Sequence, residues 1–179
     1  GKPVKMVMDR TEVFRASGPT SGGSLDVRIG AKKDGRIVAA EATIRLQAGA
    51  IAGSPIGPAC MCCYAPYDLP NIKVVGFDVV SNRPKVVAYR APGAPIGHWG
   101  VESTMDILAE ELGMDPLDLR LKNAAKEGTK THYGPTFNRI GMIETVEAAK
   151  NSDHWKSPVP AGAARGVACG FWFNIGADS

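Results

Sequence analysis

Several features that mark common protein classes are scarce or missing in this chain. It carries only four cysteines, at no regular spacing, which excludes the framework of a small disulfide-stapled domain. No apolar run reaches the roughly 20 residues of a membrane-spanning helix, so we expect no membrane span. The net charge of +3 is small and its basic runs are broken, which argues against a nucleic-acid partner. A soluble domain in a reduced, cytoplasmic setting is the expectation that remains.

Two common site motifs are also absent. The run Gly93-Ala94-Pro95-Ile96-Gly97 contains glycines, but no Lys-Ser or Lys-Thr pair follows it as in a phosphate-binding loop. No G-x-S-x-G elbow is present to carry a nucleophilic serine. The sequence therefore argues against a nucleotide hydrolase and a serine hydrolase.

Histidine and cysteine, the usual soft metal ligands, do not form a recognisable set. The three histidines are scattered, and His98 could face either a ligand or the solvent, of which we expect the solvent. Cys60, Cys62 and Cys63 are clustered, but a zinc or iron-sulfur site needs paired ligands elsewhere, and only Cys169 is available. We expect these cysteines to be small buried apolar groups rather than metal ligands.

Apolar periodicity predicts alternating strands and helices without an internal repeat. The clearest unit is a hairpin, in which Leu25, Val27 and Ile29 alternate with polar residues and Asp34-Gly35 forms the turn before a return strand at 37–46. The other expected strands are 4–8, 71–81 with a bulge at Gly76, and 167–173. The expected helices are 10–15, 57–64, 99–112, a proline-started helix from Pro116 to an end at Gly128, and 142–150.

The apolar stripes of the two central helices predict which side chains are buried. Val101 and Met105 fall on the buried face of the first helix, while Glu102 falls off that face. Gly113 stands where a left-handed C-cap is needed. In the second helix Arg120 lies beside the apolar stripe, so we expect its replacement to be tolerated.

Together these elements predict an α+β domain, with a mixed β-sheet covered by helices on one side. A length of 179 residues suits one domain, and the Pro/Ala-rich stretch 157–164 reads as a linker. Residues 167–173 are apolar throughout, which predicts a strand buried on both faces and therefore in need of further neighbours. We expect residues 1–179 to form a single, partial domain.

The turn-rich loop from Ala88 to Pro95 is the strongest candidate for a binding site. It holds one arginine, Arg90, among small and rigid residues that let a ligand approach the backbone closely. An arginine in such a loop offers a planar fork of donors to phosphate or another oxyanion. The alternative is a surface loop whose arginine is only solvated.

Four segments, in fixed order, carry a specific resemblance. They are Gly1-Lys2-Pro3-Val4 with Asp9-Arg10, Glu12 and Phe14; Tyr67 to Ile72; Ala88-Tyr89-Arg90 with Gly93, Pro95, Glu102, Met105-Asp106 and Leu108-Ala109; and Gly113 to Leu117 with Leu119 to Asn123. They resemble the molybdopterin-binding large subunit of the xanthine dehydrogenase and aldehyde oxidase family. Residues 165–168 are similar to a strand that follows in that family.

The chain also departs from the family pattern. Ile96 stands where the loop usually has glutamine, and Pro92 where the purine-oxidising members carry an aromatic residue, which argues against a purine substrate. The family's G-G-x-F-G-x-K loop, a glutamine near the molybdenum and a late catalytic glutamate have no counterpart here. The chain therefore looks like an internal fragment of a longer subunit.

The resemblance implies an oxidoreductase that hydroxylates or oxidises an aldehyde, heterocycle or similar small substrate, with water as the oxygen source. Its cofactor would be molybdenum-molybdopterin, of which the cytosine dinucleotide form is one option. Arg90, Ala91 and Gly93 would contact the cofactor and Pro92 the substrate, with no catalytic or metal-ligating residue in this span.

The resemblance also implies partners. Iron-sulfur clusters and FAD would lie on two partner subunits of a bacterial-type multisubunit complex, a dimer of heterotrimers at full length. The alternative is a noncatalytic scaffold or assembly relative of the same subunit.

Overall fold

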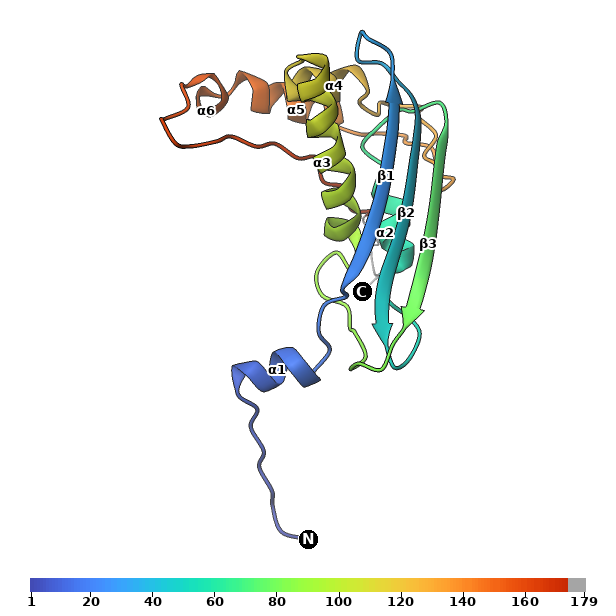
Figure 1. Cartoon of the computed structure of the whole chain (residues 1–179), viewed down its shortest axis with the longest axis vertical. Coiled ribbons are helices and arrows are strands. Elements are labelled where there is room, and N and C mark those ends of the chain that lie inside the picture. The colour runs from blue at the N-terminus through green and yellow to red at the C-terminus, as the bar shows by residue number, and fades with distance from the viewer. Residues whose placement is uncertain (174–179) are drawn as a thin grey trace.

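The computed structural model describes residues 1–173 and shows a three-stranded sheet with helices against one of its faces (Figure 1). The central strand β2 (Ile37–Gly49) pairs antiparallel with β1 (Gly23–Ala31) and parallel with β3 (Ile72–Val80). Helices α2 (Ile56–Cys62) and α3 (Ala94–Leu112) pack on the sheet. The predicted α+β class, with a mixed sheet covered by helices on one side, is confirmed.

The β1–β2 hairpin forms where the sequence predicts it. Gly35 adopts a left-handed conformation at φ 84°, and the Asp34 carboxylate accepts the Arg36 amide at 3.0 Å, so the turn is closed by local chemistry. Alternation along β2 directs one set of side chains to the helices, and Ala42, Ile44 and Leu46 are fully buried there. The main core lies between this face and the two helices.

Gly76 does not mark a bulge, which corrects the sequence-based prediction. The β2–β3 register runs without interruption past Gly76 and shifts only near Gln47 and Gly49. The glycine is required for close packing instead, because a Cβ there would lie 2.6 Å from the Cys60 Sγ of α2. Helix α2 can approach the sheet closely only where β3 lacks a side chain.

Helix α3 is longer than its pattern predicts. It begins at Ala94 rather than Trp99, with Pro95 in its first turn, and it ends at Leu112. The φ of 62° at the following residue, Gly113, confirms the left-handed cap. The apolar face of α3 is buried as predicted, with Val101 and Met105 at 0% and 1% exposure. The extra first turn places the end of the Arg90 loop directly on the helix.

The remaining helices are α1 (Arg10–Ala16), α4 (Pro116–Lys122), α5 (Met142–Asn151) and the unpredicted α6 (Asp153–Lys156). Asp115 caps α4 through the amides of Leu117 and Asp118, as expected for an acid before a proline-started helix. The predicted end at Gly128 is wrong, because α4 stops at Lys122 and Asn123 turns inward. The Asn123 amide donates to the Gly35 carbonyl at 2.9 Å and accepts from the Ile37 amide at 3.0 Å. This side chain ties α4 to the hairpin.

Two predicted strands do not form within the described residues. Residues 4–8 are an exposed arm that extends away from the sheet (Figure 1), with Val4 at 92% and Met6 at 91% exposure. Residues 167–173 are extended but pair with no strand of the part that the structure describes. Apolar character alone cannot make a strand, because the backbone also needs a neighbour with free donors and acceptors.

The connections are mostly exposed coil. Residues 130–139 form a polar loop, closed by a bridge between Lys130 and Thr136. Residues 157–164 are exposed and irregular, and their role as a linker stays a prediction. None of the helices that the structure describes has the length and apolar character needed to cross a membrane.

Candidate functional site

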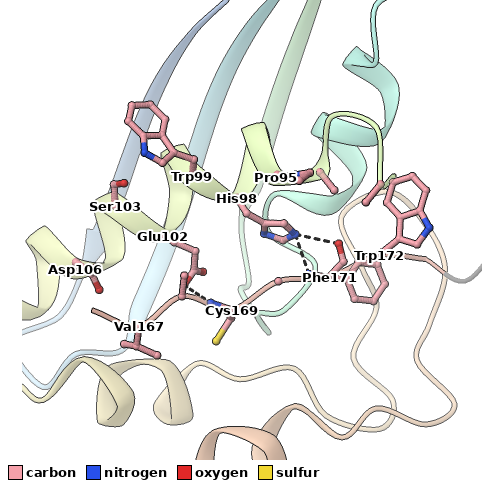
Figure 2. A pocket seen from close by; sticks show the side chains of 14 residues that line it. Pro95, His98, Trp99, Glu102, Ser103, Asp106, Val167, Cys169, Phe171 and Trp172 are labelled. Atoms are coloured by element: carbon pink, nitrogen blue, oxygen red, sulfur yellow. Dashed lines mark hydrogen bonds between the residues drawn. The ribbon is translucent and has the colours of Figure 1, made fainter. Parts of the chain in front are cut away.

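A groove of about 630 Å³ runs along α3, between this helix and the extended segment 167–172 (Figure 2). Ala91 and Pro95 line the end nearest the start of α3, and Asp106 lines it further along the helix. Trp99 and Trp172 contribute large apolar surfaces to the walls. The Arg90 loop therefore opens onto a groove with a mixed aromatic and polar lining.

The loop is held in a constrained backbone conformation. Ala91 has a φ of 55°, and within the described residues it is the only non-glycine residue in the left-handed region. Gly93 follows at φ 82°, and a Cβ there would lie 2.1 Å from the carbonyl oxygen of Pro55. The Ala91 carbonyl accepts the Ala94 amide at 3.2 Å, which joins the turn to the first residue of α3. Packing against α2 thus sets the shape of the loop.

The four residues predicted from the sequence occupy different surroundings. Ala91 lines the groove, Gly93 is buried beneath it against α2, Pro92 is half-buried, and Arg90 is exposed. Within the described residues, the Arg90 side chain makes no hydrogen bond or ion pair. Its forked donors are therefore available to a ligand. The assignment of these residues to a cofactor and a substrate stays a prediction.

A buried ion network that the sequence analysis missed reaches the groove through Glu102 and Asp106. Glu102 is 3% exposed, so the prediction that it lies off the buried face is wrong. Arg120 is fully buried, which removes the reason for expecting its replacement to be tolerated. Arg120 Nε donates to Glu102 Oε2 at 2.9 Å, and Arg120 Nη2 donates to Asp106 Oδ1 at 2.8 Å. Tyr67 also donates its hydroxyl to Glu102. Helices α3 and α4 are joined by charge as well as by apolar contact.

The surroundings of Arg120 keep it charged. Burial opposes the charged form, but the neighbouring oxygens of Tyr67 and Glu102 outweigh burial and raise the Arg120 pKa. Further donors of its guanidinium reach the carbonyls of Pro116 and Val167, both at 3.1 Å. The cation is thus satisfied on every side, which is the condition under which a buried charge is tolerated.

His98 is buried, which corrects the expectation that it faces the solvent. It is 8% exposed, and its Nε2 accepts the Phe171 amide at 2.9 Å (Figure 2). The Phe171 carbonyl is 3.1 Å from the same nitrogen. Burial lowers the His98 pKa, which favours the neutral ring. When Nε2 accepts the Phe171 amide, the ring proton lies on Nδ1, which is buried and has no hydrogen-bond partner within the described residues. His98 thus serves as a hydrogen-bond acceptor for the segment 167–172.

The Glu102 carboxylate, which lines the groove, is already engaged within the chain. Glu102 uses Oε1 for Tyr67 and Oε2 for Arg120 and for the Cys169 amide, so it has little capacity left as a general base. Burial raises the Cys169 pKa to about 11, which keeps its thiol protonated at neutral pH. The described groove can therefore bind and orient a molecule, but its reactive chemistry must come from another group.

The clustered cysteines are free thiols. Burial raises the pKa of Cys62 to about 11 and that of Cys63 to about 12, and the pKa of Cys60 is raised in the same way. His132 Nε2 is 2.7 Å from the Cys60 carbonyl rather than beside a thiol. Among residues 1–173, no group of three metal-ligating side chains converges.

One signal in the sequence could have revealed the buried network. Glu102, Asp106, Arg120 and Asn123 are four of the six polar positions in the helix motifs that carry the family resemblance, and the other two, Asp115 and Lys122, are exposed. Of the first four side chains, three are buried and the fourth, Asp106, pairs with Arg120. Polar residues that recur within two apolar helix motifs, with opposite charges on the two helices, indicate a buried pair rather than a solvated face.

Comparison with known proteins relates this geometry to a family. A model of the molybdopterin cofactor-binding domain matches residues 1–124. The chain is 37% identical over 155 residues to the nicotinate dehydrogenase large molybdopterin subunit of Eubacterium barkeri, and 35% identical over 154 residues to the aldehyde oxidoreductase of Megalodesulfovibrio gigas. These alignments cover 83% and 82% of this chain but only 36% and 17% of the two relatives.

A solved structure agrees with the sequence matches. The aldehyde oxidoreductase from Desulfovibrio gigas superimposes with a TM-score of 0.68 at 31% identity, covering 74% of this chain and 15% of the other. The fold described above is therefore found within a much longer enzyme chain.

Proposed function

Because this chain belongs to the molybdopterin cofactor-binding domain family, we propose that it is an internal part of the molybdenum-binding catalytic subunit of an oxidoreductase. The reaction would be the hydroxylation or oxidation of an aldehyde, heterocycle or similar small substrate, with water as the oxygen source. Relatives named for nicotinate and for aldehydes support this substrate range. Residues 1–179 would form a single partial domain, with 157–164 as its linker.

The observation that carries the proposal is the Arg90 loop beside the groove. Arg90 is an exposed cation with no partner in the described part of the chain, and the molybdenum cofactor carries oxygen atoms that such a fork can bind. Ala91 lines the groove, and Gly93 leaves no side chain between the loop and α2. These features fit one side of a cofactor site.

Within that site each residue has a distinct task. Arg90 would bind oxygen atoms of the cofactor, Ala91 and Gly93 would let the backbone approach it, and Pro92 would form part of the substrate wall. The bound molybdenum centre would supply the two-electron oxidation chemistry. The chain itself would orient the bound molecules, since Glu102 is engaged with Arg120 and the Cys169 amide, and His98 with the Phe171 amide.

The remaining proposals concern partners and setting. The nicotinate dehydrogenase relative is described as a large subunit, which supports partner subunits, and we propose that these carry iron-sulfur clusters and FAD. The full-length assembly would be a dimer of heterotrimers in the cytoplasm, and the cytosine dinucleotide form of the cofactor is included in the proposal.

A noncatalytic scaffold is the second candidate, and one observation favours it. Ile96, at the position where the family loop usually has glutamine, packs against the main apolar core rather than offering a polar group. A scaffold would keep the fold and lose the cofactor. Molybdenum and pterin content of the full-length subunit distinguishes the two, because only the enzyme retains both.

Replacing Arg90 with lysine in the full-length subunit tests the cofactor assignment. Lysine keeps the charge but loses the forked geometry, and losing one charge-assisted hydrogen bond should cost about 1.5–3 kcal/mol. That corresponds to roughly one to two decades in molybdenum occupancy or turnover. Metal analysis and turnover with a generic electron acceptor measure the effect, and the melting temperature should hardly change because Arg90 is exposed.

The matched control is Arg83→Lys, an exposed arginine ahead of the same loop, which should leave occupancy and turnover unchanged. Arg120, which the sequence pattern suggests as a control, is unsuitable because it is buried. Parental turnover and full metal occupancy in Arg90→Lys would place Arg90 outside the cofactor site.

The 179-residue chain alone should bind neither molybdenum nor pterin tightly. It provides one loop and one cation toward the cofactor, and a group of this size needs contacts on several sides. Elemental analysis of the purified chain, with fluorescence of released pterin, provides the measurement. Stoichiometric molybdenum in this chain would contradict the expectation.

A further inference from the structure

The extended segment 167–171, which we name the strap, is held by side chains rather than by a neighbouring strand. The Cys169 amide donates to Glu102 Oε2 at 2.8 Å, and the Phe171 amide donates to His98 Nε2 at 2.9 Å (Figure 2). The Val167 carbonyl accepts from Arg120 at 3.1 Å. Every second residue of the strap is thus bonded to a buried side chain.

This pattern follows from matching repeats in the two segments. His98 and Glu102 are four residues apart on α3, a rise of about 6 Å along the helix axis. Cys169 and Phe171 are two residues apart in extended chain, a rise of about 6.6 Å. One turn of helix therefore presents two acceptors at the spacing of two amides on one side of an extended strand. Side chains on α3 therefore accept the hydrogen bonds that the backbone of a neighbouring strand would otherwise accept.

The acceptors on α3 are themselves fixed. Arg120 and Tyr67 both donate hydrogen bonds to Glu102, and its carboxylate cannot rotate without breaking those bonds. His98 is buried, and its Nε2 accepts the Phe171 amide at 2.9 Å. Fixed acceptors define the position of the strap more closely than apolar contact would, because hydrogen bonds are directional.

We propose that Glu102 and His98 are positioning residues that fix the strap as a wall of the groove beside the Arg90 loop. This inference rests on the proposed function in one respect, that the groove adjoins the cofactor. The strap residues and Ala91 line the same groove, so a displaced strap changes the width of the space next to Ala91. The carboxylate and the imidazole thereby act on the site through the strap, without touching the bound molecules.

The test removes the acceptors while preserving the fold. His98→Leu deletes the acceptor for Phe171 and fills the same volume with an apolar group. The triple variant Tyr67→Phe, Glu102→Leu, Arg120→Met deletes the acceptor for Cys169 together with its buried partners. Replacing a complete buried polar cluster with apolar groups of similar volume is often neutral or stabilising, whereas removing one member is not.

Amide hydrogen exchange of the 179-residue chain, followed residue by residue with NMR, gives the measurement. In the parental chain the amides of Cys169 and Phe171 should exchange about tenfold more slowly than those of Ala168 and Gly170, the factor expected of one net hydrogen bond. His98→Leu should abolish the protection of Phe171, and the triple variant that of Cys169. Ser103→Ala is the matched control, because Ser103 lines the groove but bonds to no strap atom. This variant should leave the exchange rates of all four amides unchanged.

The exchange rates of amides in the core distinguish a positioning role from a role in general stability. A role in overall stability would accelerate exchange in the strap and in β2 together, whereas positioning changes the strap alone. Equal exchange at Cys169 and Ala168 in the parental chain overturns the proposal, and so does full protection of the strap in a folded His98→Leu variant. If the triple variant fails to fold, the exchange of the Phe171 amide in His98→Leu alone tests the proposal. The readout needs no cofactor, so it is independent of the Arg90→Lys result.

Discussion

Replacing Arg120 alone with methionine should lower the free energy of unfolding by about 3–5 kcal/mol, the range for breaking one side of a buried ion pair. Glu102, at 3% exposure, would have lost the cation beside it. The carbonyls of Pro116 and Val167 would lose their donor as well. An unpaired buried charge is penalised because the protein interior screens it far less than water does.

Urea denaturation of the 179-residue chain measures this loss. Lys122→Met on the same helix is the control, because Lys122 makes only a surface ion pair with Asp34 at 3.7 Å and should change the stability by less than about 0.5 kcal/mol. Adding Tyr67→Phe and Glu102→Leu to Arg120→Met should restore most of the loss. A single variant as stable as the parent would show that Glu102 is neutralised by another group.

The second large effect is expected for Gly93→Ala. A left-handed backbone costs a residue with a Cβ about 1–2 kcal/mol, and Gly93 has a φ of 82°. The new Cβ would also lie 2.1 Å from the Pro55 carbonyl oxygen, a backbone atom that cannot move aside like a side chain. Overpacking of this kind adds about 1–3 kcal/mol, for a combined destabilisation of roughly 2–5 kcal/mol.

Gly93→Ala should also displace the Arg90 loop from α2, so the full-length subunit should lose molybdenum occupancy. Denaturation in urea and metal analysis report the two effects separately. Gly57→Ala is the matched control, because Gly57 lies in α2 and, within residues 1–173, no atom apart from its chain neighbours and its own helix backbone comes within 4 Å of the place that its new methyl group would take. That variant should gain about 0.5–1 kcal/mol from better helix propensity. Unchanged stability in Gly93→Ala would mean that the loop rearranges freely, contrary to a preformed site.

The elements that the sequence predicts correctly are those with local causes. The hairpin follows from alternation and an Asp-Gly turn, whose bonds close within a few residues. Helix α3 follows from an apolar face and a glycine cap, and the start of α4 from an acid before proline. In each case neighbouring residues satisfy the backbone, so a short window of sequence contains the cause.

The errors have a common origin in contacts between distant residues. The sequence pattern indicates that Glu102 and Arg120 are surface residues. In the structure α4 packs across α3, which removes both side chains from water and pairs them. His98 reads as a solvated helix start until Phe171 lies beside it. The arm at 4–8 and the strap read as strands because they are apolar, but within the described residues neither has a strand as a neighbour.

The sequence by itself therefore determined the α+β class, the Arg90 loop as a candidate site and the family resemblance, all of which depend on residue type and local spacing. Only the tertiary structure decided which polar side chains are buried, that Ala91 rather than Arg90 lines the groove, and that α3 holds the strap through His98 and Glu102. The physical reason is that burial and hydrogen bonding are properties of pairs. The sequence does not distinguish a charged residue that is solvated from one that is buried, because the residue type is the same in both cases. The partner that makes burial possible lies far away in the chain.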